Sequence, residues 1–268
     1  YFEAKAQLMA YRKPGAPVCI NADDPWISTL IGSYAYLCSF GITQNDANMH
    51  AHLIGDQKES INFGLCSENS ISTYTITSLI GRFNAYNCLA ATCLSLRLGI
   101  DSTIIAQALA RFRSVPGRME VYQLPNGAKA IIDYAHNPSS CQAFLSLLSC
   151  ATHHLIVVLG AGGDRDRTKR PLMGSIAARY SSVFIVTSDN PRSEDPCTIA
   201  HEIITGIASD TTCIVIEELD RTQAVETAYK LSQPNSIIAI LGRGHEEYQT
   251  IGTIRHRLSD AQIVQALK

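Results

Sequence analysis

Two short segments of the chain combine glycine or proline with both signs of charge. Residues 160–171 read GAGGDRDRTKRP and follow directly after an apolar run, while residues 189–192 read DNPR and follow the next apolar run. In an α/β sheet, ligands bind beside the carboxyl ends of the strands, where these segments are expected to lie. A site that holds both charge signs so close together suits a small zwitterionic or multiply charged substrate better than a plain phosphate.

The side chains of the two segments have distinct candidate roles. Arg165 and Arg192 could each hold a carboxylate through paired hydrogen bonds, and Asp189 and Asn190 could meet an amine. Pro191 fixes the backbone and keeps Asn190 out of the helical region. A tight strand-to-helix turn in the first segment, and a helix-entry turn with a solvated arginine in the second, are the purely structural alternatives.

A third polar segment, GRGHE at 242–246, follows the last apolar strand. Gly242 and Gly244 would let a ligand approach the backbone closely, and Glu246 could accept hydrogen bonds from an ammonium group. The alternative is a plain glycine turn with exposed polar residues. Neighbouring strands present their carboxyl ends to one crevice, so the presence of all three segments strengthens the prediction of a single binding site.

Two further groups indicate a nucleotide. Residues 133–138 read DYAHNP after another strand, where Asp133 could bind a ribose hydroxyl and His136 could border the nucleotide. Asn84 and Asn87 lie three residues apart on one helix face, and their amides suit the donor–acceptor edge of adenine. A satisfied core histidine at 136 and a helix cap at Asn84 are the alternatives.

The apolar patterns predict the elements that position these residues. Expected strands after residue 117 are 121–124, 128–132, 155–159, 183–186, 213–216 and 237–241. Expected helices there are 139–150, 169–180, 195–207, 220–231 and 259–267. Repeated strand–helix units with continuously apolar strands predict an α/β domain with a mostly parallel sheet covered on both faces.

The earlier part of the chain has a different order of expected helices and strands. Expected helices are 1–9, 24–31, 83–98 and 102–112, and expected strands are 17–21, 34–40, 49–54, 60–65 and 72–77. VPG at 115–117 marks a boundary, so two domains are predicted, 1–114 and 115–268. The chain opens in a helical pattern without an initiator methionine, so we expect the downstream part of a longer protein.

Composition narrows the class of protein. The 268 residues are 46% hydrophobic with a net charge of −2, which leaves no basic field to bind nucleic acid or a membrane surface. No apolar run reaches the roughly 20 residues of a membrane span. The nine cysteines form no CxxC pair and indicate reduced, buried thiols. We expect a cytoplasmic monomer with small-molecule partners only.

Together these motifs resemble the Mur ligases, the ATP-dependent amino-acid-adding enzymes of peptidoglycan synthesis, and among them those that add 2,6-diaminopimelate. The shared motifs are YxxAK at 1–5, INADD at 20–24, GRFNAYN at 81–87, VPGRMEV at 115–121, DYAHNP at 133–138, GGDRDRTKRPLMG at 162–174, TSDNPR at 187–192 and GRGHEEYQ at 242–249. The resemblance implies an α/β chain made of the remainder of a central ATPase domain and a complete, Rossmann-like C-terminal domain.

The resemblance also implies residue roles. Lys5, by itself an ordinary solvated lysine, matches a lysine whose carbamate helps hold Mg²⁺ near an acyl phosphate. The predicted ATP site comprises Asn84, Asn87, Arg118, Asp133 and His136. The predicted meso-diaminopimelate site comprises Arg165, Asp189, Asn190, Pro191, Arg192, Gly242 and Glu246. DNPR resembles the version that selects meso-diaminopimelate over lysine. Arg243 and Ala161 stand where lysine and cysteine are common.

The implied reaction begins with phosphorylation, by ATP, of the D-glutamate side-chain carboxylate of UDP-MurNAc-L-Ala-D-Glu. The diaminopimelate amine then attacks the acyl phosphate, Mg²⁺ ions neutralise the oxyanions, and domain closure is expected to bring Arg118 and Asp133 onto ATP. The chain lacks the family's glycine-rich GKT/S loop, the upstream metal-binding acid and histidine, and the domain that holds the UDP-sugar. We therefore expect the isolated chain to be inactive.

Two alternatives remain open. One is a sibling Mur ligase or a folylpolyglutamate synthetase that takes another amino acid, against which the DNPR and GxGHE segments argue. The other is a non-catalytic domain that binds diaminopimelate or a muropeptide, which the missing GKT/S loop favours. A GKT/S loop in the parent gene would separate a ligase from a binding module.

Overall fold

The computed structural model describes residues 2–32, 34, 36–44, 47–53, 61–67, 70–76 and 79–267. Tyr1, Ala35, Ile54, Ser60 and Thr77, which the expected elements include, lie outside the described residues. The chain divides into two compact units, residues 1–113 and 114–268. Within the described part of the chain, no helix has the length and apolar character needed to cross a membrane.

The first unit is built on a five-stranded sheet. Its strands are β1 (Val18–Asn21), β2 (Leu37–Gly41), β3 (Met49–Leu53), β4 (Ile61–Ser67) and β5 (Ser70–Ile76), in the order β1-β2-β3-β4-β5. The first three strands are parallel, and β4 pairs antiparallel with both β3 and β5. The strands expected from the apolar runs are therefore present, with small shifts at their ends.

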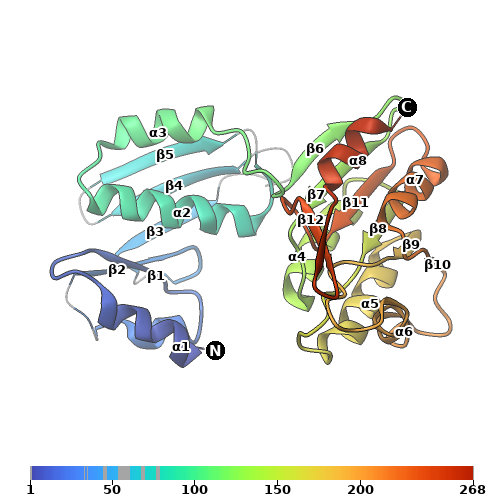
Figure 1. Cartoon of the computed structure of the whole chain (residues 1–268). Coiled ribbons are helices and arrows are strands. Elements are labelled where there is room, and N and C mark those ends of the chain that lie inside the picture. The colour runs from blue at the N-terminus through green and yellow to red at the C-terminus, as the bar shows by residue number, and fades with distance from the viewer. Residues whose placement is uncertain are drawn as a thin grey trace. The chain divides into compact units, whose positions relative to one another are not determined.

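Two longer helices cover this sheet. α2 (Arg82–Arg97) packs against β1, β2 and β4, and α3 (Ser102–Arg111) packs against β5 (Figure 1). Asp101 caps α3 by accepting a hydrogen bond from the Thr103 amide at 2.8 Å. The short helical segments are α1 (Phe2–Ala6), η1 (Gln7–Tyr11) and η2 (Ile27–Leu30), the last two being 3₁₀ turns.

The second unit contains a six-stranded sheet in the order β10-β9-β8-β11-β7-β6. The strands are β6 (Glu120–Gln123), β7 (Lys129–Asp133), β8 (Leu155–Leu159), β9 (Val183–Val186), β10 (Ile214–Glu217) and β11 (Ile237–Leu241). All neighbours are parallel except β6, which is antiparallel to β7. Every residue of β8, β9 and β11 is buried, as expected for parallel strands covered on both faces. This confirms the predicted fold class.

Five helices enclose the sheet: α4 (Pro138–Ser149), α5 (Lys169–Tyr180), α6 (Pro196–Ile204), α7 (Arg221–Leu231) and α8 (Asp260–Ala266). α5 packs between α4 and α6, and α7 packs against α8 (Figure 1). The chain runs outward from β8 through β9 to β10, and α7 then returns it to β11, between β8 and β7. The carboxyl ends of β9, β8, β11 and β7 are consequently neighbours.

One element of the second unit was not predicted. β12 (Tyr248–Ile251) and β13 (Ile254–Arg257) form an antiparallel hairpin, in which Tyr248 pairs with Arg257 and Ile251 with Ile254. The turn contains Gly252 with φ +57°, a conformation that glycine adopts without strain. The hairpin places the residues after the GRGHE segment beside the DNPR segment.

A buried ion pair joins α7, which precedes β11 in the chain, to α8, which follows the β12–β13 hairpin. Arg221 Nε donates to Asp260 Oδ1 at 2.7 Å, and Arg221 Nη2 donates to Asp260 Oδ2 at 2.8 Å and to the Leu241 carbonyl at 2.9 Å. Both charged side chains are completely buried. The pair therefore fixes the starts of α7 and α8 to the carboxyl end of β11.

We expect Asp260→Ala to lower the free energy of unfolding of the second unit by about 3–5 kcal/mol, because it leaves the Arg221 guanidinium buried without its counter-charge. Amide hydrogen exchange in α7 and β11 measures this directly. Fluorescence would not, since the single tryptophan, Trp26, lies in the first unit. Arg167→Ala, which removes an exposed partner of Glu202, serves as the control. A loss no larger than the control's would contradict the role assigned to the pair.

Candidate functional site

Loops from four neighbouring strand ends enclose a pocket of about 210 Å³ in the second unit. Its lining residues are Tyr134, His136, Gly160, Ala161, Gly162, Arg165, Lys169, Asp189, Asn190, Arg192, Gly242 and Glu246. The strand-end segments singled out in the sequence are thus brought together by the fold. Of the residues predicted for the amino-acid site, only Pro191 points elsewhere, lining a cavity of about 280 Å³ with Ser188 and Ile251.

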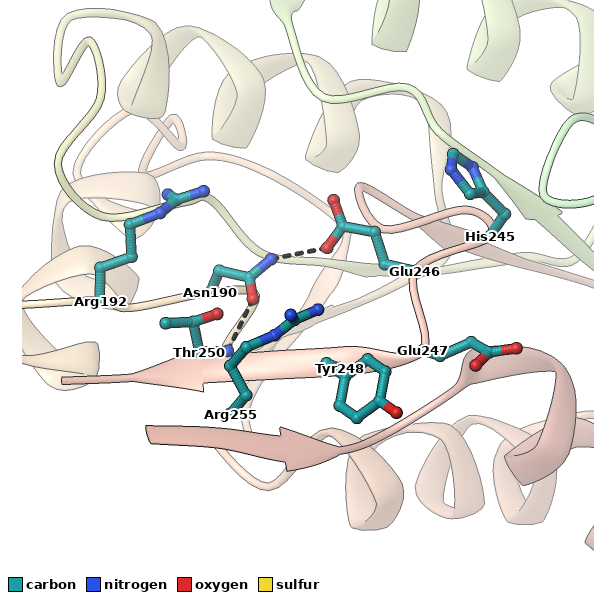
Figure 2. A pocket seen from close by; sticks show the side chains of 8 residues that line it. All are labelled: Asn190, Arg192, His245, Glu246, Glu247, Tyr248, Thr250 and Arg255. Carbon is teal, nitrogen blue, oxygen red and sulfur yellow. Dashed lines mark hydrogen bonds between the residues drawn. The ribbon is translucent and has the colours of Figure 1, made fainter. Parts of the chain in front are cut away.

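A second pocket, of about 530 Å³, lies on the hairpin side of the same loops. It shares Asn190, Arg192 and Glu246 with the first pocket and adds His245, Glu247, Tyr248, Thr250 and Arg255 (Figure 2). The Arg255 guanidinium lies 4.6 Å from the centre of the Tyr248 ring, a cation–π arrangement. Sequence reasoning missed Tyr248 and Arg255, because the hairpin that carries them was not expected.

The side-chain amide of Asn190 connects three segments of the site. Its Nδ2 donates to Glu246 Oε2 at 2.8 Å, and its Oδ1 accepts from the Thr250 amide at 2.8 Å (Figure 2). Nδ2 also donates to Asp189 Oδ1 at 3.0 Å. Asn190 and Asp189 are both buried. The ends of β9 and β11 and the strand β12 are therefore held in one arrangement around the Glu246 carboxylate.

Arg192 is positioned by its backbone as well as by its side chain. Its φ is +52°, in the left-handed region that non-glycine residues rarely adopt. Its amide donates to the Thr250 carbonyl at 3.0 Å, and its carbonyl accepts from the Gly252 amide at 2.6 Å. Nη1 donates to the Gly163 carbonyl at 2.6 Å. A guanidinium has five N–H donors, so it can hold this contact and still bind a carboxylate.

Glycine packs the loops closely against one another. A Cβ at Gly163 would collide with the Pro191 carbonyl oxygen, and one at Gly242, where φ is +106°, would lie 2.7 Å from Asp189 Oδ2. The Gly163 amide donates to the Asn190 carbonyl at 2.9 Å. The space that Gly242 frees is thus occupied by the protein's own aspartate, rather than by a ligand.

A buried arginine holds the two charged loops together, and the sequence did not reveal it. The side chain of Arg170 is completely buried, and it donates to both carboxylate oxygens of Glu194 at 2.8 Å and to Glu202 at 2.6 Å. Glu194 also accepts from the Asp164 amide at 2.6 Å. Arg170 holds the pKa of Glu194 down, at about 2. Arg170, one of three arginines in the first segment, supports the loop from inside.

Lys169 adds a cation to the smaller pocket. Its Nζ donates to the His136 carbonyl at 2.8 Å, and partial burial lowers the pKa of Lys169. Arg165 also lines this pocket, with Nη1 donating to the Asp164 carbonyl at 3.1 Å. The pocket is therefore lined by two basic side chains from the segment after β8, Arg165 and Lys169, and by the Glu246 carboxylate.

Two residues predicted for the nucleotide lie close together, Asp133 at the end of β7 and Arg118 just before β6. Asp133 is buried and accepts hydrogen bonds from the amides of Met119 and Ala135, each at 2.9 Å. Burial raises the pKa of this carboxyl group, against the effect of these hydrogen bonds. The Arg118 guanidinium lies 4.9 Å from the centre of the Tyr134 ring. The structure therefore shows Asp133 shaping the turn that carries Arg118.

His136 lies exposed at the same strand end. Its Nδ1 donates to the Tyr134 carbonyl at 2.7 Å, and its ring lies 4.8 Å from the Tyr134 ring. It is thus not the satisfied core histidine that was the structural alternative for this position.

The other residues predicted for ATP and metal binding belong to the first unit. Asn87 Nδ2 donates to Asn84 Oδ1 at 3.2 Å, and Asn84 Nδ2 donates to the Ile80 carbonyl at 3.0 Å. They share one face of α2 as expected, and the N-cap position is occupied by Gly81 instead of Asn84. Lys5 is exposed on α1. Among the residues that the structure describes, no group of three or more His, Cys, Asp or Glu side chains is arranged to hold a metal ion.

Comparison with known families identifies both parts of the chain. Residues 1–95 match the Mur ligase middle domain, and residues 117–244 match the Mur ligase glutamate ligase domain. The chain therefore belongs to the Mur ligase family and contains parts that match its middle domain and its glutamate ligase domain.

Individual relatives are more specific. The chain is 38% identical over 264 residues to UDP-N-acetylmuramoyl-L-alanyl-D-glutamate–2,6-diaminopimelate ligase of Gloeobacter violaceus, covering 98% of this chain and 53% of the relative. The enzyme of the same name from Syntrophomonas wolfei is 39% identical, covering 94% of this chain and 52% of the relative. The chain spans about half the length of the curated relatives it matches.

Solved structures agree with this placement. A structure of UDP-N-acetylmuramoyl-L-alanyl-D-glutamate–2,6-diaminopimelate ligase superposes with a TM-score of 0.60 at 32% identity, covering 99% of this chain and 55% of that one. A pseudomurein peptide ligase type C from Methanothermus fervidus gives a TM-score of 0.72 at 20% identity, covering 90% of this chain and 56% of that one. The second similarity, at low identity, supports the fold alone.

The Arg170–Glu194 contact predicts a pH dependence. Because the pKa of Glu194 falls from its usual 4.5 to about 2 on folding, its charge stabilises the fold above pH 4.5, and this stabilisation disappears as the pH falls toward 2. Glu194→Gln should therefore be less stable than the wild type at pH 7, with a difference that shrinks below pH 4.5. Denaturant unfolding between pH 7 and pH 3, followed by circular dichroism, measures it.

Glu226→Gln, which changes an exposed glutamate on α7, is the matched control and should behave as the wild type. A difference between Glu194→Gln and the wild type that stays constant down to pH 3 would contradict the electrostatic role of Glu194.

Proposed function

We propose that this chain supplies the amino-acid-binding part of an ATP-dependent ligase that adds meso-2,6-diaminopimelate to UDP-MurNAc-L-Ala-D-Glu in peptidoglycan synthesis. The observation that carries the proposal is the joined pair of pockets, in which Arg165 and Arg192 line the walls and the Glu246 carboxylate is held by Asn190. The names of the relatives described above support the same substrate.

The charges of the site complement those of the amino acid. Diaminopimelate carries two carboxylates and two ammonium groups, whereas lysine has one carboxylate fewer. Arg165 and Arg192 would bind carboxylates, and Glu246 with Asp189 would accept hydrogen bonds from an ammonium group. Lysine would leave one of the two guanidinium groups without its partner. A site built for a charged hydrogen bond discriminates strongly against an analogue that lacks the group.

The proposed reaction joins this amino acid to an activated carboxylate. ATP would phosphorylate the D-glutamate side chain of UDP-MurNAc-L-Ala-D-Glu, and an uncharged diaminopimelate amine would attack the acyl phosphate to form the amide. The second unit would orient the amine, because its carboxylate-binding arginines fix the other end of the substrate. The proposed activity is thus amide-bond formation between two small molecules.

Nucleotide binding is proposed for Asn84, Asn87, Arg118, Asp133 and His136. The packing of Arg118 on the Tyr134 ring supports a phosphate-binding role, since it leaves the edge of the guanidinium available for phosphate oxygens. Mg²⁺, when bound, neutralises crowded phosphate oxygens. Lys5, as a carbamate, would supply one carboxylate ligand to it, and no three-ligand cluster occurs in the described ranges to complete the set.

The setting of the enzyme is also proposed. The net charge of −2 gives no support for nucleic-acid or anionic membrane partners. We infer a cytoplasmic monomer that acts on small molecules, which agrees with the absence of paired CxxC cysteines in the sequence.

Replacing Arg192 tests the amino-acid assignment. Titration calorimetry of the 268-residue chain should show tighter binding of meso-diaminopimelate than of L-lysine. Arg192→Ala should weaken binding of meso-diaminopimelate by roughly 10- to 100-fold, the size expected for a hydrogen bond between charged groups, and leave lysine binding nearly unchanged.

Arg257→Ala is the control for this test. Arg257 is an exposed arginine on β13, in the hairpin beside the DNPR segment, and is absent from the lining of both pockets, so its loss should leave both affinities unchanged. Equal affinities of wild type and Arg192→Ala for both ligands would contradict the assignment.

The chain by itself should form no amide. Its sequence contains no GKT or GKS phosphate-binding loop, so ATP should not activate the carboxylate even at saturating diaminopimelate. An assay that follows both phosphate release and product mass tests this. ATP-dependent amide formation by residues 1–268 alone would overturn the expectation, while leaving the binding assignment intact.

A further inference from the structure

Three cysteine thiols meet in the core of the first unit, away from the proposed ligand sites. Cys93 Sγ on α2 lies 3.2 Å from Cys19 Sγ on β1 and 3.5 Å from Cys38 Sγ on β2. Cys19 and Cys38 are direct partners in the parallel pairing of β1 with β2. Cys93 therefore faces a pair of thiols presented side by side by two adjacent strands.

The three cysteines differ in their exposure to solvent. Cys38 and Cys93 are buried, whereas Cys19 is only partly buried. Cys19 is thus the member of the cluster nearest to solvent, and a small oxidant would enter past it. Hydrogen bonds from Cys19 and Cys93, together with the nearby Arg97 guanidinium, hold the pKa of the Cys38 thiol well below its usual range. The cluster therefore favours a thiolate, the reactive form of cysteine.

Geometry selects which thiols can pair. A disulfide needs Cβ atoms about 3.5–4.5 Å apart, whereas directly paired residues on neighbouring strands keep their backbones about 4.8 Å apart with parallel side chains. A bond between Cys19 and Cys38 would therefore strain the sheet. Cys93 lies on α2, which packs on both strands, and its sulfur atom is already in contact with the sulfur atoms of Cys19 and Cys38. A bond from Cys93 to either thiol therefore needs only a small movement of the two sulfur atoms.

We propose that Cys19, Cys38 and Cys93 form an oxidisable thiol site, which a hydroperoxide converts to a single disulfide that always includes Cys93. The bond joins α2 covalently to β1 or β2. Since α2 also carries Asn84 and Asn87, oxidation restrains the helix on which the adenine-side residues lie.

Oxidation of two thiols to the disulfide proceeds in two steps. The Cys38 thiolate attacks one peroxide oxygen, which gives a sulfenic acid on Cys38 and releases hydroxide. The Cys93 thiol then attacks that sulfur, which forms the disulfide, and its proton leaves with the displaced hydroxyl as water. The hydroxide from the first step takes up the proton that Cys38 lost on ionising, so hydrogen peroxide is reduced to two waters while the two thiols together lose two electrons. Attack by the Cys19 thiolate on Cys93 can move the bond to Cys19–Cys93 and release Cys38.

Hydrogen peroxide titration of the reduced 268-residue chain tests the proposal. After alkylation of the remaining thiols and digestion with an Asp-specific protease and trypsin, tandem mass spectrometry should locate one disulfide, from Cys93 to Cys19 or Cys38. The oxidised chain should also show a higher denaturant midpoint in Trp26 fluorescence, because Trp26 reports on the same unit, and dithiothreitol should reverse this shift.

Single substitutions sharpen the test. Cys93→Ser should abolish the disulfide, whereas Cys19→Ser and Cys38→Ser should each retain the remaining pair. Cys88→Ser is the matched control, since Cys88 is a buried cysteine on the same helix and should leave the disulfide unchanged. The wild-type map decides the proposal even if Cys93→Ser does not fold. No disulfide in the wild type, a Cys19–Cys38 bond, or sulfinic acid on Cys93 in place of a disulfide would overturn it.

Discussion

The architecture of the candidate site depends on the side-chain amide of Asn190. Its two polar atoms reach Glu246 after β11, Asp189 after β9 and the backbone of β12. A buried amide that bonds to a carboxylate and a backbone amide at once fixes loops that would otherwise move independently. The Glu246 carboxylate is then oriented before a ligand arrives, which reduces the ordering cost of binding.

Buried arginines stabilise the loops, and more accessible arginines remain for a ligand. Arg170 and Arg221 bind carboxylates inside the second unit, and the buried Arg243 donates to the Leu258 carbonyl at 2.8 Å. Arg165 and Arg192, by contrast, line the pockets. This division links the sheet topology to the proposed chemistry, because the segment after β8 supplies one arginine of each kind, Arg165 and Arg170.

The sequence alone predicted the α/β architecture and the meeting of three strand-end segments, since both follow from apolar periodicity and from the rules of parallel sheets. It did not predict the β12–β13 hairpin, whose short polar strands have little apolar signal. Nor did it distinguish Arg170, which points inward, from Arg165. The direction of a side chain in a charged loop depends on tertiary partners such as Glu194, which lies 24 residues farther along the chain.

We propose that one end of this sheet holds an amino acid with two carboxylates and two ammonium groups between guanidinium groups and Glu246. A crystal structure of the 268-residue chain with meso-diaminopimelate tests it most directly. We expect a ligand carboxylate on Arg192 and an ammonium group on Glu246, within the two joined pockets. Diaminopimelate bound elsewhere on the chain, or bound in these pockets with its charges facing away from both residues, would contradict it.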